Sequence, residues 1–505
     1  MKKPAWITLT TVGLVFAGSA LAQVKDFKPV TQQMLENPNP EDWLMFSRTY
    51  DAQRFSPLDE INTENVGGLT LKWSRNLREG NTETIPIVHD GVMYVVTPGA
   101  IVQALDAATG DIIWQYKRDV SDGVGGSART KSLAIYEDVI VYTAPDSFVV
   151  GLDARTGEMR WQAEAGTRGH TSAPIIVNGL AISGGACFGN RDNCYLSAHK
   201  VATGEEVWRF YTTPAPGEPG DESWNGAELS NRQASTWGLP GSYDPERGLI
   251  YWGIANAMPD HRAARHGGDA SGTSFSSPSD LYSNSTVALD PATGKLSWYY
   301  QHLPGDDWDL DATHERTLIN TAVAPDPKFV KWINPDITKG ERRDIAVTIT
   351  EGGGLFALDR NNGEFLWATP FPFDVPELWL DHIDPATGKV HIKEELVFKN
   401  PGDSKIICFW NTRSYWPTAY HPGTNSLYTS YIDACRQLNS ATATAPESWR
   451  VVARPGADPA ALTGLAKIDM ATGEVVRFDM GRAPGNGAML TTGGNLLFHG
   501  DMDRR

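Results

Sequence analysis

Basic residues are in short supply in this 505-residue chain. Lysine and arginine number 44 against 61 aspartates and glutamates, so the formal net charge is −17 at pH 7. Proteins that bind nucleic acid need clustered lysine and arginine to contact phosphates, which argues against nucleic acid as a partner. An acidic surface suits a basic partner or a cationic ligand instead. Beyond the N-terminus, no stretch is long and apolar enough to cross a bilayer as a helix.

Cysteine is also scarce, with four residues in the whole chain. None of them forms a C-x-x-C-H sequence, so no covalently attached haem is expected. Cysteines of an exported chain are usually oxidised, and four of them allow three pairings. Cys187 lies close in sequence to Cys194, as Cys408 does to Cys435, which favours these two local disulfides.

The N-terminus has the pattern of an export signal. Lys2 and Lys3 precede an apolar run, and Ala20-Leu21-Ala22 is a small-residue cleavage site. We expect residues 1–22 to be a signal peptide and 23–505 to be the mature domain, which is then periplasmic or secreted. Removing Lys2 and Lys3 leaves 42 basic against 61 acidic residues, a net charge of −19.

A phrase built on an A-T-G turn and a tryptophan recurs along the chain. Its copies are ALDAATGDIIW (104–114), GLDARTGEMRW (151–161), AHKVATGEEVW (198–208), ALDPATGKLSW (288–298), ALDRNNGEFLW (357–367) and the degenerate KIDMATGEVVRF (467–478). In each copy a strand ends, the glycine turns the chain with a positive φ angle, and a second strand runs back. The tryptophan can pack on the neighbouring unit.

The spacing of the repeat predicts the fold class. Gly110, Gly157 and Gly204 are 47 residues apart, and a period near 45 residues with about four short strands is typical of a β-propeller. The span from Trp73 onward accommodates seven to nine blades, and we expect eight. Two long loops, 213–232 and 258–284, are expected over a functional face. A propeller by itself can be either an enzyme or a binding scaffold.

The acidic stretch PGDDWDLD (304–311) raises the question of function. It places Asp306, Asp307, Asp309 and Asp311 around Trp308. Such a stretch can be a solvated surface loop, or some of its carboxylates can hold a cation and accept a proton.

Several motifs together resemble the pyrroloquinoline-quinone (PQQ) dependent alcohol dehydrogenases. They are the opening at 41–73, the TG-x-x-x-W phrases, STWGLPGSYDPERGLIYWGIANAMP at 235–259 and the acidic stretch, and the resemblance extends over residues 41–503. It implies a bound PQQ, a flat tricarboxylate quinone that needs apolar walls, cations for its carboxylates and a metal ion at its quinone oxygen.

The resemblance also implies a cofactor site. Trp237 is expected to stack beneath the ring, and Gly185 and Ala186 to run along it. The remaining contacts implied by the resemblance are Glu83, Thr171, and Arg129 and Lys131, which are equal candidates for a PQQ carboxylate.

The metal site is implied in the same way. Asn256 matches an amide ligand, and Asp309 matches the catalytic aspartate that also approaches the ion. Asp311 is the additional carboxylate of lanthanide-using members, whereas calcium users have an uncharged residue there. Calcium and a lanthanide both remain open, and both prefer oxygen ligands. Asp306 and Asp307 are then expected to be structural, in a polar loop or turn.

The chain departs from the family pattern at several positions. Cys187 stands where a bidentate glutamate ligand is expected, and a disulfide is its more suitable role because thiolates match hard cations poorly. The adjacent-cysteine disulfide that covers PQQ is missing from 122–129. Glu351 replaces an arginine near the quinone oxygens, and Asn486 replaces a tryptophan. The sequence ends at Arg505 before a final repeat unit, so we expect the last blade to be truncated.

The implied reaction is oxidation of an alcohol to an aldehyde or ketone. Asp309 removes the hydroxyl proton, a hydride passes to PQQ, and electrons leave singly to a soluble cytochrome c. A homodimer is possible in this family. Two alternatives stay open: a polyol or aldose dehydrogenase with the same cofactor, and a scaffold without a cofactor. The changes at Cys187, Glu351 and Asn486 favour the scaffold slightly, but the match at four site positions weighs against it more: Trp237, Asn256, Asp309 and Asp311.

Overall fold

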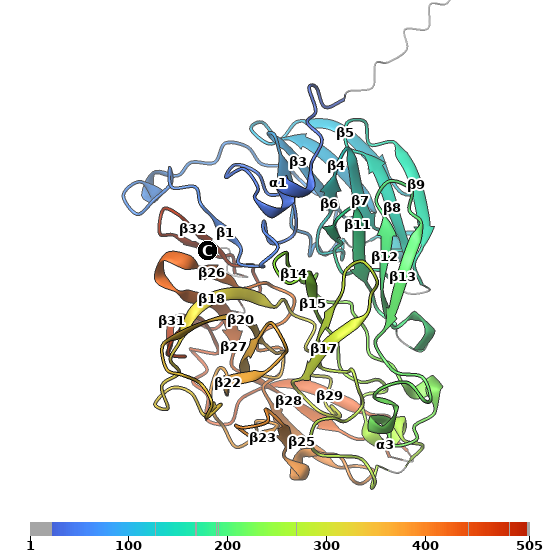
Figure 1. The fold of residues 1–505 in the computed structure, drawn as a ribbon, viewed down its shortest axis with the longest axis vertical. Helices are drawn as coiled ribbons and strands as arrows, with labels where there is room; N and C mark the ends of the chain where they lie inside the picture. Colours follow the sequence, from blue (N-terminus) through green and yellow to red (C-terminus); the bar gives the residue numbers. More distant parts are fainter. Residues whose placement is uncertain are drawn as a thin grey trace, which may run out of the picture.

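The computed structural model describes residues 23–501, apart from 127, 167–168, 188, 190, 269, 443 and 484. The predicted signal peptide at 1–22 lies outside the described residues. Sheets follow one another around the molecule as the chain proceeds, from blue at the top of Figure 1, through green at the right, to orange and red at the left. The predicted all-β, propeller-type architecture is confirmed.

The first four sheets have four antiparallel strands each, in chain order. Their strands are β2 (Ile87–His89), β3 (Val92–Thr97), β4 (Ile101–Asp106) and β5 (Ile112–Lys117); β6 (Ala134–Tyr136), β7 (Val139–Thr143), β8 (Phe148–Asp153) and β9 (Met159–Glu164); β10 (Ile175–Val177), β11 (Leu180–Gly184), β12 (Tyr195–Lys200) and β13 (Glu206–Tyr211); and β14 (Ser242–Asp244), β15 (Leu249–Gly253), β16 (Ser285–Leu289) and β17 (Leu296–Gln301).

Three further sheets continue the series. The first joins β18 (Thr317–Val323), β19 (Trp332–Ile333), β20 (Glu341–Ile349), β21 (Leu355–Asp359) and β22 (Phe365–Thr369); the second β26 (Ala419–His421), β27 (Ser426–Ile432), β30 (Thr463–Asp469) and β31 (Val475–Gly481); and the third β1 (Phe55–Ser56), β32 (Leu490–Thr492) and β33 (Leu497–Phe498). In the third, β1 pairs in parallel with β32, which brings early and late parts of the chain together.

Two smaller sheets lie outside this series. They are β23 (Leu380–Ile383) with β24 (Val390–Ile392), and β25 (Ser404–Cys408) with β28 (Ala434–Asn439) and β29 (Ser448–Ala453). Strands β28 and β29 are inserted between β27 and β30, which pair with each other in the preceding series. Because the described residues form seven sheets of the blade type, the count of eight blades stays a prediction.

The helices are short. They are α1 (Gln32–Glu36), α2 (Asp122–Gly125) and α3 (Arg262–Arg265), with 3-10 turns η1 (Val66–Gly68), η2 (Arg191–Asn193), η3 (Asp221–Trp224), η4 (Leu229–Asn231), η5 (Glu394–Leu396) and η6 (Pro422–Thr424). Across the described part of the chain, none of the helices has the length and apolar character needed to span a membrane.

Five tryptophans pack on the turn glycine of the next unit, as the repeat predicts, whereas Val330 is the nearest group to Gly473, the turn glycine that follows Trp367. Trp114 lies so close to Gly157 that a Cβ added there would be 2.4 Å from the indole, and its Nε1 donates to the Ala154 carbonyl at 3.0 Å. Gly157 also has a φ angle of +75°, a conformation that glycine adopts without strain. The same contact joins Trp73 to Gly110, Trp161 to Gly204, Trp208 to Gly294 and Trp298 to Gly363. The tryptophans therefore connect successive sheets.

Candidate active site

The acidic stretch is buried. Trp308 is fully buried between β17 and β18, and Asp306 and Asp307 are at most 1% exposed. The Asp306 carboxylate accepts the backbone N–H groups of Trp308 and Leu310, each at 2.7 Å. Asp306 therefore shapes the turn that presents Asp309, whose φ angle of +62° is a left-handed conformation. The expectation of a structural role for Asp306 fits this geometry, but a solvated surface loop does not.

Asp307 ties the stretch to neighbouring segments. Its carboxylate accepts the N–H of Arg262 at 2.7 Å and that of Phe398 at 2.8 Å. Arg262 and Arg265 of α3 donate to the carbonyls of Gly305 and Asp306 at 2.5 and 2.7 Å. Loop 258–284 therefore packs directly on the acidic stretch, in keeping with its expected place at a functional face.

Asp309 is the accessible acid of the stretch. Its side chain is 38% exposed, and its Oδ2 accepts a hydrogen bond from Arg436 of β28 at 3.0 Å. Burial of its surroundings, together with the negative charge of Asp260, raises the pKa of Asp309 to about 7. A base with a pKa near neutrality is suited to accept a proton from a substrate hydroxyl.

Asp311 connects two of the predicted site residues. Its Oδ1 accepts the backbone N–H of Asn256 at 3.0 Å, and its Oδ2 accepts the indole N–H of Trp237 at 2.9 Å. Each carboxylate oxygen keeps a second lone pair that can face a cation. Burial and the nearby Asp309 raise the pKa of Asp311 to about 7. The structure thus brings Trp237, Asn256 and Asp311 together, from motifs separated by up to 74 residues.

Trp237 and Lys131 form an aromatic and cationic wall. The Lys131 ammonium lies 5.2 Å from the centre of the Trp237 ring and 4.7 Å from that of Tyr415, and it pairs with Glu83. Lys131 is buried, which lowers the pKa of its ammonium group. Arg129 is exposed, so the structure separates these two equal candidates. Tyr415 was missed by the sequence analysis, because nothing in its local pattern marks it.

The other predicted cofactor residues surround the same wall. The Thr171 hydroxyl donates to the Trp237 carbonyl at 2.9 Å, which fixes the backbone beneath the ring. Gly185 is buried, and a Cβ there would be 2.9 Å from the Gly169 carbonyl oxygen, so the backbone passes closely. Ala186 follows it and is half-buried.

Two more acids near Asp309 were not predicted as site residues. The Asp260 carboxylate accepts the Asn256 side-chain N–H at 2.9 Å, and burial and the charge of Asp306 raise its pKa to about 6. Glu351 is 7% exposed, and burial and the charge of Asp311 hold its pKa well above the ordinary value. The surroundings of Glu351 thus favour its neutral form, at the position where the resemblance places an arginine.

Both predicted disulfides are present. Cys187 pairs with Cys194, and Cys408 pairs with Cys435. Cys187 is therefore not available as a metal ligand, although it stands where the resemblance places a glutamate. The second disulfide joins β25 to β28 directly before Arg436.

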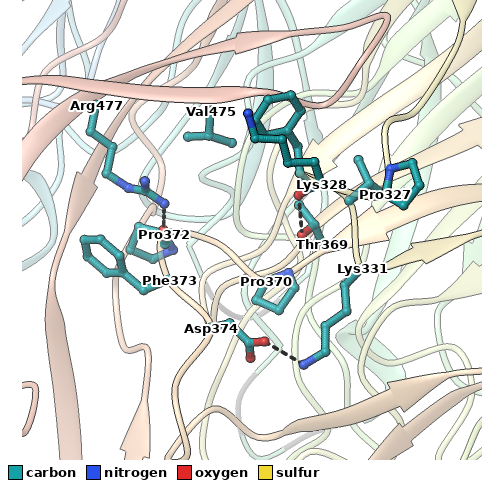
Figure 2. A pocket seen from close by; sticks show the side chains of 12 residues that line it. Pro327, Lys328, Lys331, Thr369, Pro370, Pro372, Phe373, Asp374, Val475 and Arg477 are labelled. Atoms are coloured by element: carbon teal, nitrogen blue, oxygen red, sulfur yellow. Dashed lines mark hydrogen bonds and ion pairs between the residues drawn. The ribbon is translucent and has the colours of Figure 1, made fainter.

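A separate surface cavity of about 430 Å³ contains none of these residues. Figure 2 shows it, lined by Pro327, Lys328, Thr369, Pro370, Phe373 and others. Lys331 contacts Asp374 at 2.7 Å, Arg477 bonds the Pro372 carbonyl, and the Lys328 ammonium lies 4.8 Å from the centre of the Phe329 ring. This cavity offers no catalytic group to compare with the Asp309 region.

Similarity to known proteins identifies the family of this chain. Residues 43–372 match the PQQ family described as glucose/ethanol/alcohol dehydrogenase, beta-propeller domain. The chain belongs to the PQQ-dependent dehydrogenase family. It is 30% identical to quinohemoprotein alcohol dehydrogenase ADH-IIG of Pseudomonas putida, covering 92% of this chain and 67% of that protein. It covers 47% of an alcohol dehydrogenase (quinone) subunit of Gluconobacter oxydans, at 32% identity. The chain thus spans about half to two thirds of these relatives.

Solved structures give the same assignment. A europium-containing methanol dehydrogenase superposes with a TM-score of 0.79 at 26% identity, covering 94% of this chain and 84% of that one. Among the sequence relatives, quinoprotein alcohol dehydrogenase PedH of Pseudomonas putida is 27% identical over 98% of this chain and 83% of that protein. The predicted family is confirmed.

The wall fits PQQ in this PQQ-dependent family member. A flat quinone tricarboxylate needs a ring to stack on and cations for its carboxylates, and Trp237, Lys131 and the exposed Arg129 have these properties. The donors beside the wall, Asp309, Asp311 and Asn256, supply the oxygen atoms that hard cations prefer. In the described part of the chain, no group of three or more His, Cys, Asp or Glu side chains is placed to hold a metal on its own. The ion would therefore also need oxygens from the amide and from the cofactor.

Proposed function

We propose that this protein oxidises an alcohol to an aldehyde or ketone with PQQ and a calcium or lanthanide ion. The observation that carries the proposal is the hydrogen bond from the Trp237 indole to Asp311 at 2.9 Å. It joins Trp237, the ring on which a flat cofactor would stack, to Asp311, a carboxylate that suits the metal ion bound beside that cofactor. A scaffold without a cofactor gives no reason for this arrangement around a raised-pKa acid such as Asp309.

Different residues have different roles in the proposed reaction. Bound PQQ would supply the two-electron oxidant, and the metal ion a Lewis acid beside it. Trp237 and Lys131 would hold the ring and one carboxylate, while Asn256, Asp309 and Asp311 would hold the ion. The Asp309 carboxylate accepts the proton of the substrate hydroxyl, because it is the exposed acid at this position.

The partners and location belong to the same proposal. A net charge of −17 favours a basic, soluble electron acceptor such as a cytochrome c. The two disulfides and the N-terminal signal pattern support an oxidising, periplasmic location. We propose residues 23–505 as the dehydrogenase domain.

Reconstitution tests this function. The purified protein is mixed with PQQ and either Ca²⁺ or La³⁺, and quinone absorbance and dye reduction are measured with primary alcohols, polyols and aldoses. We expect PQQ binding with at least one ion, and turnover with alcohols. Turnover with sugars alone would favour the polyol or aldose dehydrogenase, and failure of PQQ to bind with either ion would favour the scaffold.

A further inference from the structure

Arg436 is the buried cation that faces the exposed acid of the site. Its side chain is 4% exposed, although it lies on the small sheet formed by β25, β28 and β29, outside the seven blade-type sheets. One guanidinium nitrogen, Nη1, donates both to the Asp309 carboxylate at 3.0 Å and to the Trp308 carbonyl at 2.7 Å. Arg436 therefore binds the side chain of Asp309 and the backbone just before it.

Two tryptophans, whose rings pack on each other with centres 5.3 Å apart, lie against the guanidinium. Its central carbon lies 4.6 Å from the Trp449 ring centre and 5.5 Å from that of Trp410. Stacking on aromatic faces favours arginine over lysine at such a position. Arg436 Nε is buried and makes no hydrogen bond with the described residues.

The strand that carries Arg436 is firmly anchored. Cys435, the preceding residue, forms the disulfide to Cys408 across the β25–β28 pair. Trp410 is attached to the same strand, because its backbone N–H donates to the Ala434 carbonyl at 3.0 Å. The disulfide and the tryptophans restrict the positions that the guanidinium can reach.

An acidic residue stands in place of a basic one beside the acidic stretch. Glu351 occupies the place where the family resemblance puts an arginine near the quinone oxygens, so the arginine is lost from β20–β21. Glu351 N–H donates to the Asp311 carbonyl at 3.0 Å, which places this exchange beside the acidic stretch. The chain supplies a different guanidinium from β28, on the side of Asp309.

We propose that Arg436 is a positioning residue that replaces the lost arginine and fixes the Asp309 carboxylate in the orientation needed to accept the substrate proton. This inference rests on the proposed alcohol oxidation. The two tryptophan rings contact the guanidinium as Asp309 does, so the shape and planarity of the group should matter as well as its charge.

Substitution and chemical rescue test the inference. Arg436→Ala leaves a space beside the Trp410 and Trp449 rings that a free guanidinium ion can enter. We expect Arg436→Ala and Arg436→Gln to lower kcat by about 100-fold, the effect of losing one preorganised group, with KM and PQQ affinity changed by less than about threefold. Guanidinium chloride at low millimolar concentration should restore part of the kcat of Arg436→Ala. Sodium chloride should not, and Arg436→Lys should recover less than the guanidinium-supplied variant.

Arg450→Ala is the matched control. Arg450 lies on the adjacent strand β29, is exposed, and donates to Gln437 at 2.7 and 2.9 Å. It should keep wild-type turnover and show no response to guanidinium. Wild-type kcat in Arg436→Gln would overturn the inference. So would a loss of PQQ affinity in Arg436→Ala without rescue, because that pattern indicates a purely structural role.

A second measurement separates this inference from the proposed function. Thermal midpoints of the cofactor-free wild type, Asp309→Asn, Arg436→Gln and the double variant form a double-mutant cycle. We expect the double variant to lose at least about 2 °C less than the sum of the single losses. Additive losses would overturn the Arg436–Asp309 pairing. If PQQ fails to bind the wild type, the proposed function fails, while the cycle still decides the pairing.

Discussion

The two walls of the candidate site are built differently. One wall, with Lys131, Thr171 and Trp237, belongs to the segments that lead into β6, β10 and β14, the first strands of three repeated sheets. The other, with Asp260, Asp309 and Arg436, comes from a loop, a left-handed turn and an inserted sheet. The repeat fixes the first wall through stacked tryptophans, whereas long-range hydrogen bonds and ion pairs hold the second. Residues that match the family pattern occur on both walls, and so do departures from it: Cys187 directly follows Gly185 and Ala186 near the first wall, and Glu351 lies beside the acidic stretch of the second.

Asp309→Asn should have the largest effect, because it removes the proposed base without changing the size of the side chain. We expect kcat to fall by at least about 10³-fold, while PQQ affinity changes by less than about threefold. Steady-state dye reduction measures kcat, and an absorbance titration measures the affinity for PQQ. Asp381→Asn, at an exposed acid of β23, is the control and should keep normal turnover. Normal turnover in Asp309→Asn would refute the assignment of the base.

Substitutions of Trp237 test the contributions of the two walls separately. Trp237→Ala removes both the stacking face and the N–H to Asp311, so PQQ should bind about 10- to 100-fold more weakly. Trp237→Phe keeps a stacking ring and loses only the N–H. It should lose less PQQ affinity than Trp237→Ala and show weaker metal binding, measured by calorimetry with La³⁺. Equal affinities for PQQ in the wild type and Trp237→Ala would place the cofactor elsewhere.

The sequence predicted the first wall well and the second only in part. The period of the A-T-G and tryptophan phrases is local and regular, so fold class, tryptophan packing and both disulfides could be predicted. Arg436 and Tyr415 could not, because each reaches the site from a segment more than 100 residues away from its partner and carries no local signal. Burial of Asp306 and Asp307 was also missed, since four acids in six residues suggest solvent unless their hydrogen-bond donors are known.

The repeat that supports the first wall can be tested by filling a turn. Gly157→Ala combines a φ angle of +75° with a collision against the Trp114 ring. We expect a loss of about 2 to 4 kcal/mol in the free energy of unfolding, measured by chemical denaturation. Gly217→Ala is the matched control, because Gly217 has a φ angle of +84° and nothing within 4 Å of the added Cβ. It should lose only about 1 kcal/mol. Equal losses would show that strain, and not tryptophan packing, governs the turn.

His261 tests how ion pairs hold the second wall. Its Nε2 lies 3.0 Å from Glu447, beside the inserted sheet, and its Nδ1 lies 3.8 Å from Asp307 of the acidic stretch. Burial opposes the charged ring, but these two carboxylates raise the pKa of His261 to about 10. Because the folded pKa exceeds the unfolded value near 6.5, this stabilisation is complete below about pH 6.5 and is lost as the pH rises through about 10.

His261→Gln should therefore be less stable than the wild type at pH 6, by about 1 to 2 kcal/mol, and nearly equal to it at pH 10. Denaturation curves across this pH range measure the difference, and His382→Gln, at an exposed histidine of β23, controls for loss of a surface ring. A constant difference between wild type and His261→Gln at all pH values would mean that the ring acts by packing on Phe398, 4.6 Å away, and not by charge. In that case ring packing would hold the second wall as it holds the first. The two walls would then differ only in the segments that form them.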